Sequence, residues 1–325
     1  MTSAVAFHKG IYKSGLVRRV AEWLDATPHP PLAIEITPDF VAAARWSRTG
    51  GLDNFAVQPL PRGAVVPSAV EVNLVNSSAV RSVMTSVCRQ LKTREEEAAL
   101  LLPDPVIRVF VQHFEEFPRK PEEALPMLRW KLKKSVPFEA DETVLSYMLQ
   151  QPRESGVDVV TGLGRLRIIR EYEGLAEAVG LLPGVILSSS LAALSLLEAQ
   201  RPTLLARISG AALTTAIVRE GNLCGYRSTE LPAYGDELTP QMLLEEIFPL
   251  AAYYQDTWND GIQSVLLAGL GNRLPEFIPP LEAEFHCRVR SLSATVVTEG
   301  RIRENAHALV DRELDGLLGW SLHHN

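Results

Sequence analysis

Two stretches of the chain, far apart in sequence, share one pattern of three short strands joined by tight turns. The first, "PLAIEITPDFVAAARWSRTGGLDNFAVQPL" (31–60), predicts strands at Leu32–Ile36, Phe40–Trp46 and Phe55–Val57. The second begins at Thr203 and reads "TLLARIS", "LTTAIVRE" and "LCGYRST". Each meander is followed by alternating helical and strand patterns. The chain is therefore predicted to be an α/β fold with an internal duplication.

The segments that follow the meanders carry recognisable helix signals. Asn76 or Ser77 is expected to cap a helix after the first meander, and Thr239 followed by Pro240 starts one after the second. No low-complexity linker separates the two halves. The closing segment "NAHALVDRELDGLLGWSL" (305–322) is predicted as one C-terminal helix.

The composition is that of a folded protein without a membrane span. Hydrophobic residues make up 46% of the 325 residues and charged residues 22%, and the net charge of −7 argues against a dedicated nucleic-acid binder. No apolar run approaches the roughly 20 residues that cross a bilayer, and the N-terminus lacks an apolar signal core. The three cysteines (Cys88, Cys224 and Cys287) are far apart and are expected to be reduced thiols in the core.

Motifs that would indicate an enzyme are missing from the sequence. There is no GxSxG, HExxH, Walker loop or GxGxxG. The glycine pairs in "GLGRL" (162–166) and "GLGNR" (269–273) are typical of tight turns between a strand and a helix. We therefore predict no catalytic residue and no metal site, and we favour a protein that is not an enzyme.

The segment "LRWKLKKSVPFEADETVLSYMLQ" (128–150) combines a basic helix end, a Pro-Phe stop and acidic residues before a strand. Pro121 begins the helix, and Leu128 and Leu132 fall on one face. Trp130 lies about 200° around the helix from Leu128 and so belongs to another face. The lysines suit a helix C-terminus.

This segment resembles a stretch of the PilM proteins of type IV pilus assembly, which have an actin-like, FtsA-like fold. In that family a Trp-bearing helix runs into Pro-Phe, then acidic residues, then a strand that ends near a Tyr. The matching residues here are Arg129, Trp130, Pro137, Phe138, Glu139, Glu142 and Tyr147. Four further matches follow in the family's order, so that the resemblance covers roughly 31–322: "VDVV…YEGLAEAVGLLPGVILSSSLAAL" (157–194), "LEEIFPLAAYYQ" (244–255), "VLLAGLGNRLPEF" (265–277) and "GLLGWSL" (316–322).

The resemblance implies an actin-like duplicated fold made of two meander-plus-helix domains. The family inserts a helical subdomain over the nucleotide, but here only "ELPAYGDELTPQM" (230–242) joins the second meander to its helix, so that subdomain is expected to be missing or much reduced. The expected units are an extension with an amphipathic helix (1–30), domain I with an inserted subdomain at about 105–155 (31–200), domain II with a reduced insertion (201–300), and a C-terminal helix that returns to domain I (301–325).

The resemblance also implies ATP bound between the two halves, with an acid and a glycine at each meander turn. The family's Asp-x-Gly-Ser is Glu35, Ile36, Thr37 and Pro38 here, and its second Asp-x-Gly is Arg207, Ile208 and Ser209, with Gly210 displaced by one position. Thr37 carries a Cβ, Pro38 has no N–H, and Arg207 can touch a phosphate but cannot hold Mg²⁺. The adenosine-side glycines reduce to Gly269 and Gly271. These residues predict a degenerate cofactor site and no bound ATP or Mg²⁺.

The family's partner is the short cytoplasmic N-terminal peptide of PilN, a single-span inner-membrane protein, and it docks beside the basic helix. The resemblance therefore predicts partner contacts at Arg129, Trp130, Lys133, Lys134, Pro137 and Phe138. It further implies other pilus-assembly partners, no nucleic acid, and a cytoplasmic protein held at the inner membrane only through its partner. Two alternatives stay open, an actin-like ATPase or kinase with a working nucleotide site and the related cytoplasmic domain of a type II secretion system.

Overall fold

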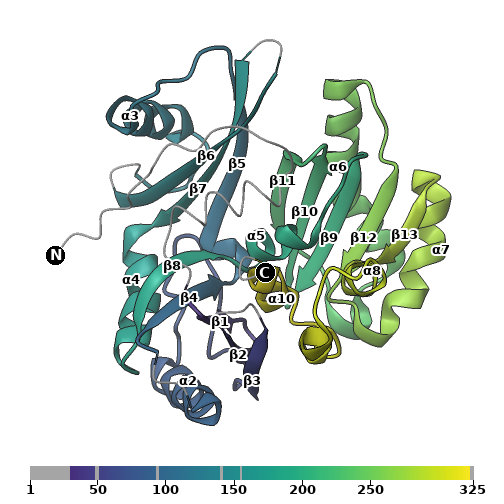
Figure 1. The fold of residues 1–325 in the computed structure, drawn as a ribbon. Helices are drawn as coiled ribbons and strands as arrows, with labels where there is room; N and C mark the ends of the chain where they lie inside the picture. Colours follow the sequence, from purple (N-terminus) through teal and green to yellow (C-terminus); the bar gives the residue numbers. More distant parts are fainter. Residues whose placement is uncertain (1–29, 48–50, 93–94, 140–141, 154–155, 323–325) are drawn as a thin grey trace.

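The computed structural model has two lobes, each built on a five-stranded sheet, with a smaller unit inserted into the first (Figure 1). It describes residues 30–47, 51–92, 95–139, 142–153 and 156–322. The predicted extension helix therefore lies outside the described residues. No helix among the described residues is long and apolar enough to cross a membrane.

The first lobe holds a mixed sheet in the order β3-β2-β1-β4-β8. Its strands are β1 (Leu32–Ile36), β2 (Phe40–Trp46), β3 (Leu52–Pro59), β4 (Glu97–Leu102) and β8 (Leu182–Ser188). The first three form the antiparallel meander, and β4 and β8 run parallel to β1. Strands β1 and β4 are buried on both faces, which explains their nearly continuous apolar sequences.

The second lobe repeats this topology strand for strand, in the order β11-β10-β9-β12-β13. Its strands are β9 (Thr203–Ser209), β10 (Ala212–Arg219), β11 (Asn222–Glu230), β12 (Ser264–Ala268) and β13 (Arg288–Ser291). Again the meander is antiparallel and the other two strands are parallel to its first strand. The predicted duplication is confirmed.

Helices cover both sheets, and several begin at a residue whose side chain caps them. The helices of the first lobe are α2 (Ser77–Leu91), α4 (Leu166–Glu177) and α5 (Ser189–Ala193), followed by η3 (Leu194–Leu196). Those of the second lobe are α6 (Pro240–Trp258), η5 (Gly271–Arg273), α7 (Leu274–Phe285) and α8 (Leu292–Thr298). As predicted, the side chains of Asn76 and Thr239 cap α2 and α6.

The inserted unit is a three-stranded antiparallel sheet, β5-β7-β6, covered by one helix. It contains η1 (Asp104–Val106), β5 (Ile107–Phe114), α3 (Pro121–Leu132), β6 (Thr143–Arg153) and β7 (Gly156–Arg165). A small core of its own joins α3 to the sheet through Leu128, Leu132 and Tyr147. The unit ends at Arg165, beyond the boundary near residue 155 expected from the sequence.

No helical subdomain lies between β11 and α6 within the described chain. The connection, residues 231–239, contains only the short turn η4 (Gly235–Glu237). Arg273 anchors it through hydrogen bonds to the carbonyls of Gly235 and Leu238. The expected loss of the family's helical insertion is confirmed.

The C-terminal segment forms three short pieces rather than the single helix predicted. These are η6 (Glu304–Ala306), α9 (His307–Val310) and α10 (Asp315–Ser321). The chain reverses at Glu313, whose φ is +54°, and the N–H of Leu314 bonds the carbonyl of Leu309. Leu309 and Leu314 are both buried but stand five residues apart, so one continuous helix would place them on different faces.

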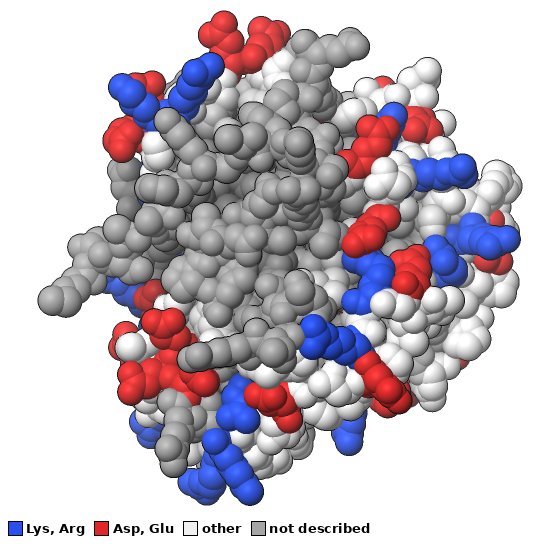
Figure 2. Space-filling view, viewed as in Figure 1, with Lys and Arg blue, Asp and Glu red and all other residues white. Residues whose placement is uncertain are grey.

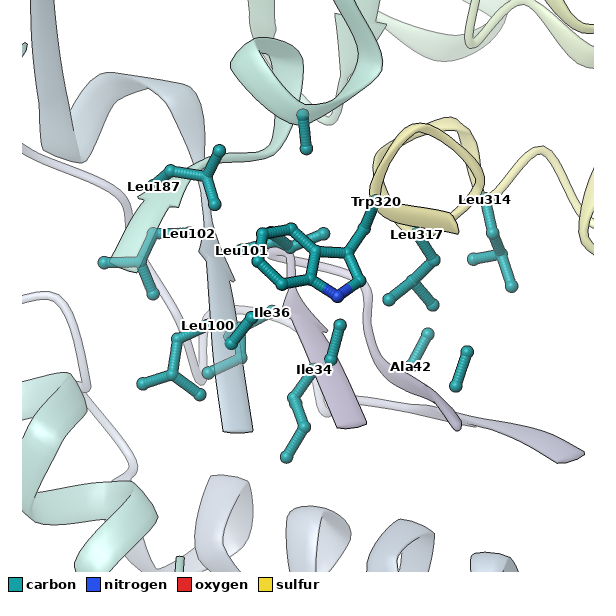
Figure 3. Close-up of a cluster of buried hydrophobic side chains, with 14 of the residues drawn as sticks. Ile34, Ile36, Ala42, Leu100, Leu101, Leu102, Leu187, Leu314, Leu317 and Trp320 are labelled. Atoms are coloured by element: carbon teal, nitrogen blue, oxygen red, sulfur yellow. The ribbon is translucent and has the colours of Figure 1, made fainter. Parts of the chain in front are cut away.

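Helix α10 packs against the first lobe, where Trp320 is fully buried among side chains of β1 and β4 (Figure 3). Two glycines let the helix approach α5 closely. A Cβ at Gly319 would lie 2.0 Å from the Ala192 carbonyl oxygen, and one at Gly316 would lie 2.4 Å from Ser189 Oγ. This contact explains the glycines of "GLLGWSL" and brings Asp315 to the interior between the lobes.

Candidate functional site

The first turns of the two meanders face each other across the gap between the lobes. A Cβ at Gly210 would lie 3.2 Å from Cγ of Pro38 and 3.7 Å from a carboxylate oxygen of Asp39. The predicted cofactor residues Glu35, Thr37, Ser209 and Gly210 thus meet at one place, with the Pro38 ring filling the space between the turns.

Glu35 and Arg207 occupy equivalent positions in the two duplicated hairpins. Glu35 pairs with Ala42 across the first turn, and Arg207 pairs with Thr214 across the second, at the same distance from the turn in sequence. Both side chains are buried, and Nη2 of Arg207 donates to Oε1 of Glu35 at 3.0 Å. The duplication therefore places an acid of one lobe against a base of the other.

A wider polar cluster surrounds this pair. Asp104, at the start of η1, accepts hydrogen bonds from the N–H of Ser190 at 2.9 Å, its Oγ at 2.5 Å and Thr214 Oγ1 at 2.9 Å. Nη1 of Arg207 lies 3.2 Å from Ser190 Oγ and 3.7 Å from Oδ2 of Asp104. Oδ2 of Asp315 lies 4.0 Å from Nε of Arg207. We call Glu35, Asp104, Ser190, Arg207, Thr214 and Asp315 the interlobe cluster.

The electrostatics of the cluster follow from one guanidinium among three buried carboxyl groups. Burial disfavours the charged form of Arg207, but Glu35, Asp104 and Asp315 outweigh that effect and raise its pKa above the usual value. Burial raises the pKa of Asp315 to about 7, against the lowering influence of Arg207. One carboxylate oxygen, Oε2 of Glu35, has no hydrogen-bond partner among the described residues.

The other predicted cofactor residues serve local structure. Thr37 Oγ1 accepts from the N–H groups of Asp39 and Phe40 and donates to the Phe40 carbonyl, so its hydroxyl is used within its own turn. Gly269 has a φ of +79°, and a Cβ there would lie 1.9 Å from the Ile208 carbonyl oxygen. Gly271, at a φ of +53°, lies near the carboxylate of Glu313. Backbone geometry alone accounts for both glycines.

These residues do not fit a metal-bound nucleotide. Phosphates need N–H or cationic donors, but Arg207 is already paired with carboxylates and Pro38 has no N–H. Nη1 and Nη2 of Arg207 are used within the cluster, whereas its buried Nε has no hydrogen-bond partner among the described residues. The unpartnered Glu35 oxygen is an acceptor, which a phosphate oxygen cannot satisfy. No group of three or more His, Cys, Asp or Glu side chains in the described parts of the chain is arranged to hold a metal.

The predicted partner residues lie at the C-terminal end of α3 and just after it. Trp130 is 79% exposed while Leu128 is fully buried, which confirms that the two lie on different faces. Lys133, Lys134 and Pro137 are exposed beside it. We call Trp130, Lys133, Lys134 and Pro137 the α3 surface.

Other predicted partner residues have structural contacts instead. Nη1 of Arg129 donates to the carbonyl and hydroxyl oxygens of Thr143, which ties α3 to β6. Phe138 is half-buried against the small core of the inserted unit. Lys133 lies 3.7 Å from the Glu139 carboxylate, and both side chains are exposed, so this pair contributes little stability and leaves the lysine available.

Two further residues beside Trp130 are absent from the set of partner residues predicted from the sequence. Pro126 is exposed and Met127 half-exposed, four and three residues before the tryptophan. Residues at these spacings share a helix face, so helical periodicity around Trp130 would have found them. They extend the apolar part of this face by one turn.

A concave surface lies between α2 and α4. It is a groove of about 480 Å³ lined by Val72, Leu74, Arg81, Glu171, Gly174 and Leu175, among others. Oε2 of Glu171 accepts from the N–H of Asn73 at 2.9 Å and so holds one wall in place. Arg165 links this wall to the inserted unit, because it donates to the Val70 carbonyl and pairs with Glu142 at 2.9 Å.

Charge on the face seen in Figure 2 is mixed rather than concentrated. Outside the atoms drawn grey, basic and acidic side chains alternate over both lobes and the inserted unit. On this face the described residues form no large patch of one sign.

Comparison with known proteins identifies the fold. No family model matches the chain, and no curated protein matches it in sequence. Among solved structures, it superposes on a chain of a PilM–PilN type IV pilus biogenesis complex with a TM-score of 0.70 and 17% identity, covering 91% of this chain and 99% of that one. The chain has an actin-like fold. The predicted resemblance to PilM is confirmed at the level of structure.

Two further solved structures match the chain with lower scores. The cytoplasmic domain of EpsL, an inner-membrane component of the Vibrio cholerae type II secretion system, matches with 13% identity and a TM-score of 0.45 over 73% of this chain and 80% of that one. The ethanolamine utilization protein EutJ from Carboxydothermus hydrogenoformans matches with 11% identity and a TM-score of 0.49 over 91% and 90%.

Proposed function

We propose that the chain is a cytoplasmic scaffold of a type IV pilus or related secretion apparatus, which binds the cytoplasmic N-terminal peptide of a PilN-like inner-membrane protein. The observation that carries the proposal is the exposed Trp130 on the α3 surface, in a fold similar to a chain solved as part of a PilM–PilN complex. The partner's membrane span holds the complex at the inner membrane.

The α3 surface has the chemistry of a peptide-docking site. A large aromatic side chain that is exposed in the free protein becomes an anchor once a partner covers it. Lys133 and Lys134 lie one turn after Trp130 and favour a peptide with acidic residues, because complementary charge speeds association. Arg129 and Phe138 support this surface from within the inserted unit.

The groove between α2 and α4 extends the proposed binding path. Arg165 joins the base of the inserted unit to the groove wall, so a peptide can run from the α3 surface to Val72 and Leu175. Gly174 leaves this part of the groove open, since a Cβ there meets no atom within 4 Å. Arg81 lies at the other side of the groove and offers a charge to an acidic residue.

The test is peptide binding measured by fluorescence polarisation. The probe is a synthetic peptide with the sequence of the cytoplasmic N-terminus of the proposed PilN-like partner. Trp130→Ala is expected to raise Kd at least tenfold, about 1.4 kcal/mol. Tyr253→Ala alters another exposed aromatic side chain, on α6, and is expected to leave Kd unchanged.

Gly174→Trp separates the two docking elements. If it abolishes binding while Trp130→Ala does not, the peptide lies in the groove and the assignment to Trp130 is wrong. If the unsubstituted chain binds no such peptide, the scaffold proposal fails.

The alternative function, an actin-like ATPase or kinase, requires a working nucleotide site. We propose that none is present, on the strength of the paired Arg207 and the self-bonded Thr37 turn. Isothermal calorimetry with Mg-ATP decides between them. A Kd tighter than about 100 µM, roughly −5.5 kcal/mol, would favour the enzyme and reject the degenerate site.

A further inference from the structure

We propose that Arg207 acts as an internal ligand that holds the two lobes closed, in the place where an actin-like protein holds its metal and phosphates. The closed arrangement then needs no nucleotide. This inference concerns the relation between the lobes and goes beyond the proposed peptide binding.

The contacts of Arg207 run from one lobe to the other. Its guanidinium comes from β9 of the second lobe, whereas Glu35 of β1, Ser190 of α5 and Asp104 belong to the first. Thr214 of β10, also in the second lobe, donates a hydrogen bond to Asp104 of the first lobe. Separating the lobes would break each of these bonds together.

Burial makes the cluster specific for one arrangement. Arg207 is 4% exposed and Glu35 is inaccessible to water, so their attraction acts in a low-dielectric interior. Such a buried pair adds little net stability compared with an apolar contact, but removing one partner leaves an uncompensated charge. A guanidinium presents its donors in a fixed planar fork, and so it defines the geometry of the groups it joins.

Contacts elsewhere along the gap support the same closed arrangement. The side chain of Gln150, 1% exposed, bonds both the N–H and the carbonyl of Leu223, and so ties β6 of the inserted unit to β11 of the second lobe. Arg62, after β3, reaches Tyr234 of the β11–α6 connection at 3.4 Å. The cluster is thus the centre of an interface rather than an isolated ion pair.

The facing turns provide a direct reporter of closure. A Cβ at Gly210 would lie 3.7 Å from Cβ of Pro38, within the range that a disulfide spans. A Pro38→Cys, Gly210→Cys chain should therefore form an interlobe disulfide when the lobes are closed. The φ of +58° at position 210 strains a cysteine there, and every chain compared below carries that same strain. The rate of its formation under a mild oxidant, followed by mass spectrometry of the digest, measures how often the turns meet.

We expect the disulfide to form without nucleotide, at a rate that Mg-ATP does not change. Adding Arg207→Met should slow it at least tenfold, and Arg207→Lys should fall between the two. Arg219→Met, which removes a guanidinium paired with Glu220 and Asp260 within the second lobe, is the matched control and should have no effect. Thr214→Val removes a single hydrogen bond and should slow the reaction by a few fold in a chain that folds.

Two results would overturn the proposal. One is an unchanged rate in Arg207→Met and Thr214→Val chains that unfold cooperatively. The other is acceleration by Mg-ATP in the chain that retains Arg207, since closure would then depend on a bound nucleotide.

Discussion

The buried carboxyl group of Asp315 predicts an unusual dependence of stability on pH. Its pKa rises from 3.8 to about 7 in the folded protein because burial penalises the charged form. Between these pH values the folded state keeps the proton and the unfolded state releases it. The stabilisation is therefore complete below pH 3.8 and is lost as the pH rises to about 7.

The magnitude follows from the difference between the two pKa values. Each pH unit between them changes the free energy of unfolding by about 1.4 kcal/mol. From pH 5 to pH 8 the loss therefore sums to about 2.5 kcal/mol, since the change levels off near the folded-state value. Asp315→Asn keeps the shape of the side chain but has no titrating carboxyl group. Its free energy of unfolding should therefore not show this loss between pH 5 and pH 8.

The assay is urea unfolding of both proteins at pH 5 and pH 8. Other titrating groups contribute equally to both and cancel in the difference. The free energy of unfolding of Asp315→Asn, minus that of the unsubstituted chain, should rise by about 2.5 kcal/mol from pH 5 to pH 8. Asp311→Asn removes an exposed carboxylate from the same segment and serves as the control. A difference that stays constant within about 0.5 kcal/mol, well below the predicted change, would refute the reasoning.

Two further substitutions test close contacts, each by urea or thermal unfolding. Gly319→Ala should destabilise the chain by about 1–3 kcal/mol because its Cβ would strike the Ala192 carbonyl. Gly174→Ala is the control, since its Cβ enters open space, and it should be neutral or stabilising. Equal effects of the two substitutions would contradict the tight α5–α10 contact. Gln150→Leu should destabilise by about 2 kcal/mol or more, since the N–H and carbonyl of Leu223 lose their buried partner. A neutral result would show that water or another group replaces the amide.

The elements that could be predicted are those determined by local pattern. Strands β1 and β2 have the predicted bounds because short apolar runs between turn residues specify a buried strand. The exposure of Trp130 followed from its angle to Leu128 on one helix. Repetition of the meander predicted the repeated strand order, since two copies of a pattern can bury their apolar faces in the same way.

The interlobe cluster could not be predicted because its members come from separate elements. Asp104 follows β4, Ser190 is the second residue of α5 and Asp315 begins α10, and only the topology brings them to Arg207. The sequence shows that Arg207 departs from the family's acid, but it does not show that Arg207 pairs with Glu35. The sequence offers one signal that predicts such a pair, namely charges of opposite sign at equivalent positions of the two duplicated hairpins.

That signal also connects the cleft with the proposed function. Two acids at the equivalent positions would repel each other across the gap, and a cation from outside would be needed to join them. With Glu35 in one hairpin and Arg207 in the other, the chain supplies the cation itself. If the proposed closure holds, the cleft has no use for a subdomain that covers a purine, and the connection of residues 231–239 contains only the short turn η4. Under the proposed function the lobes serve as a rigid support, and recognition is assigned to surfaces that stay open. Among these, the α3 surface presents the most exposed aromatic side chain of the described residues.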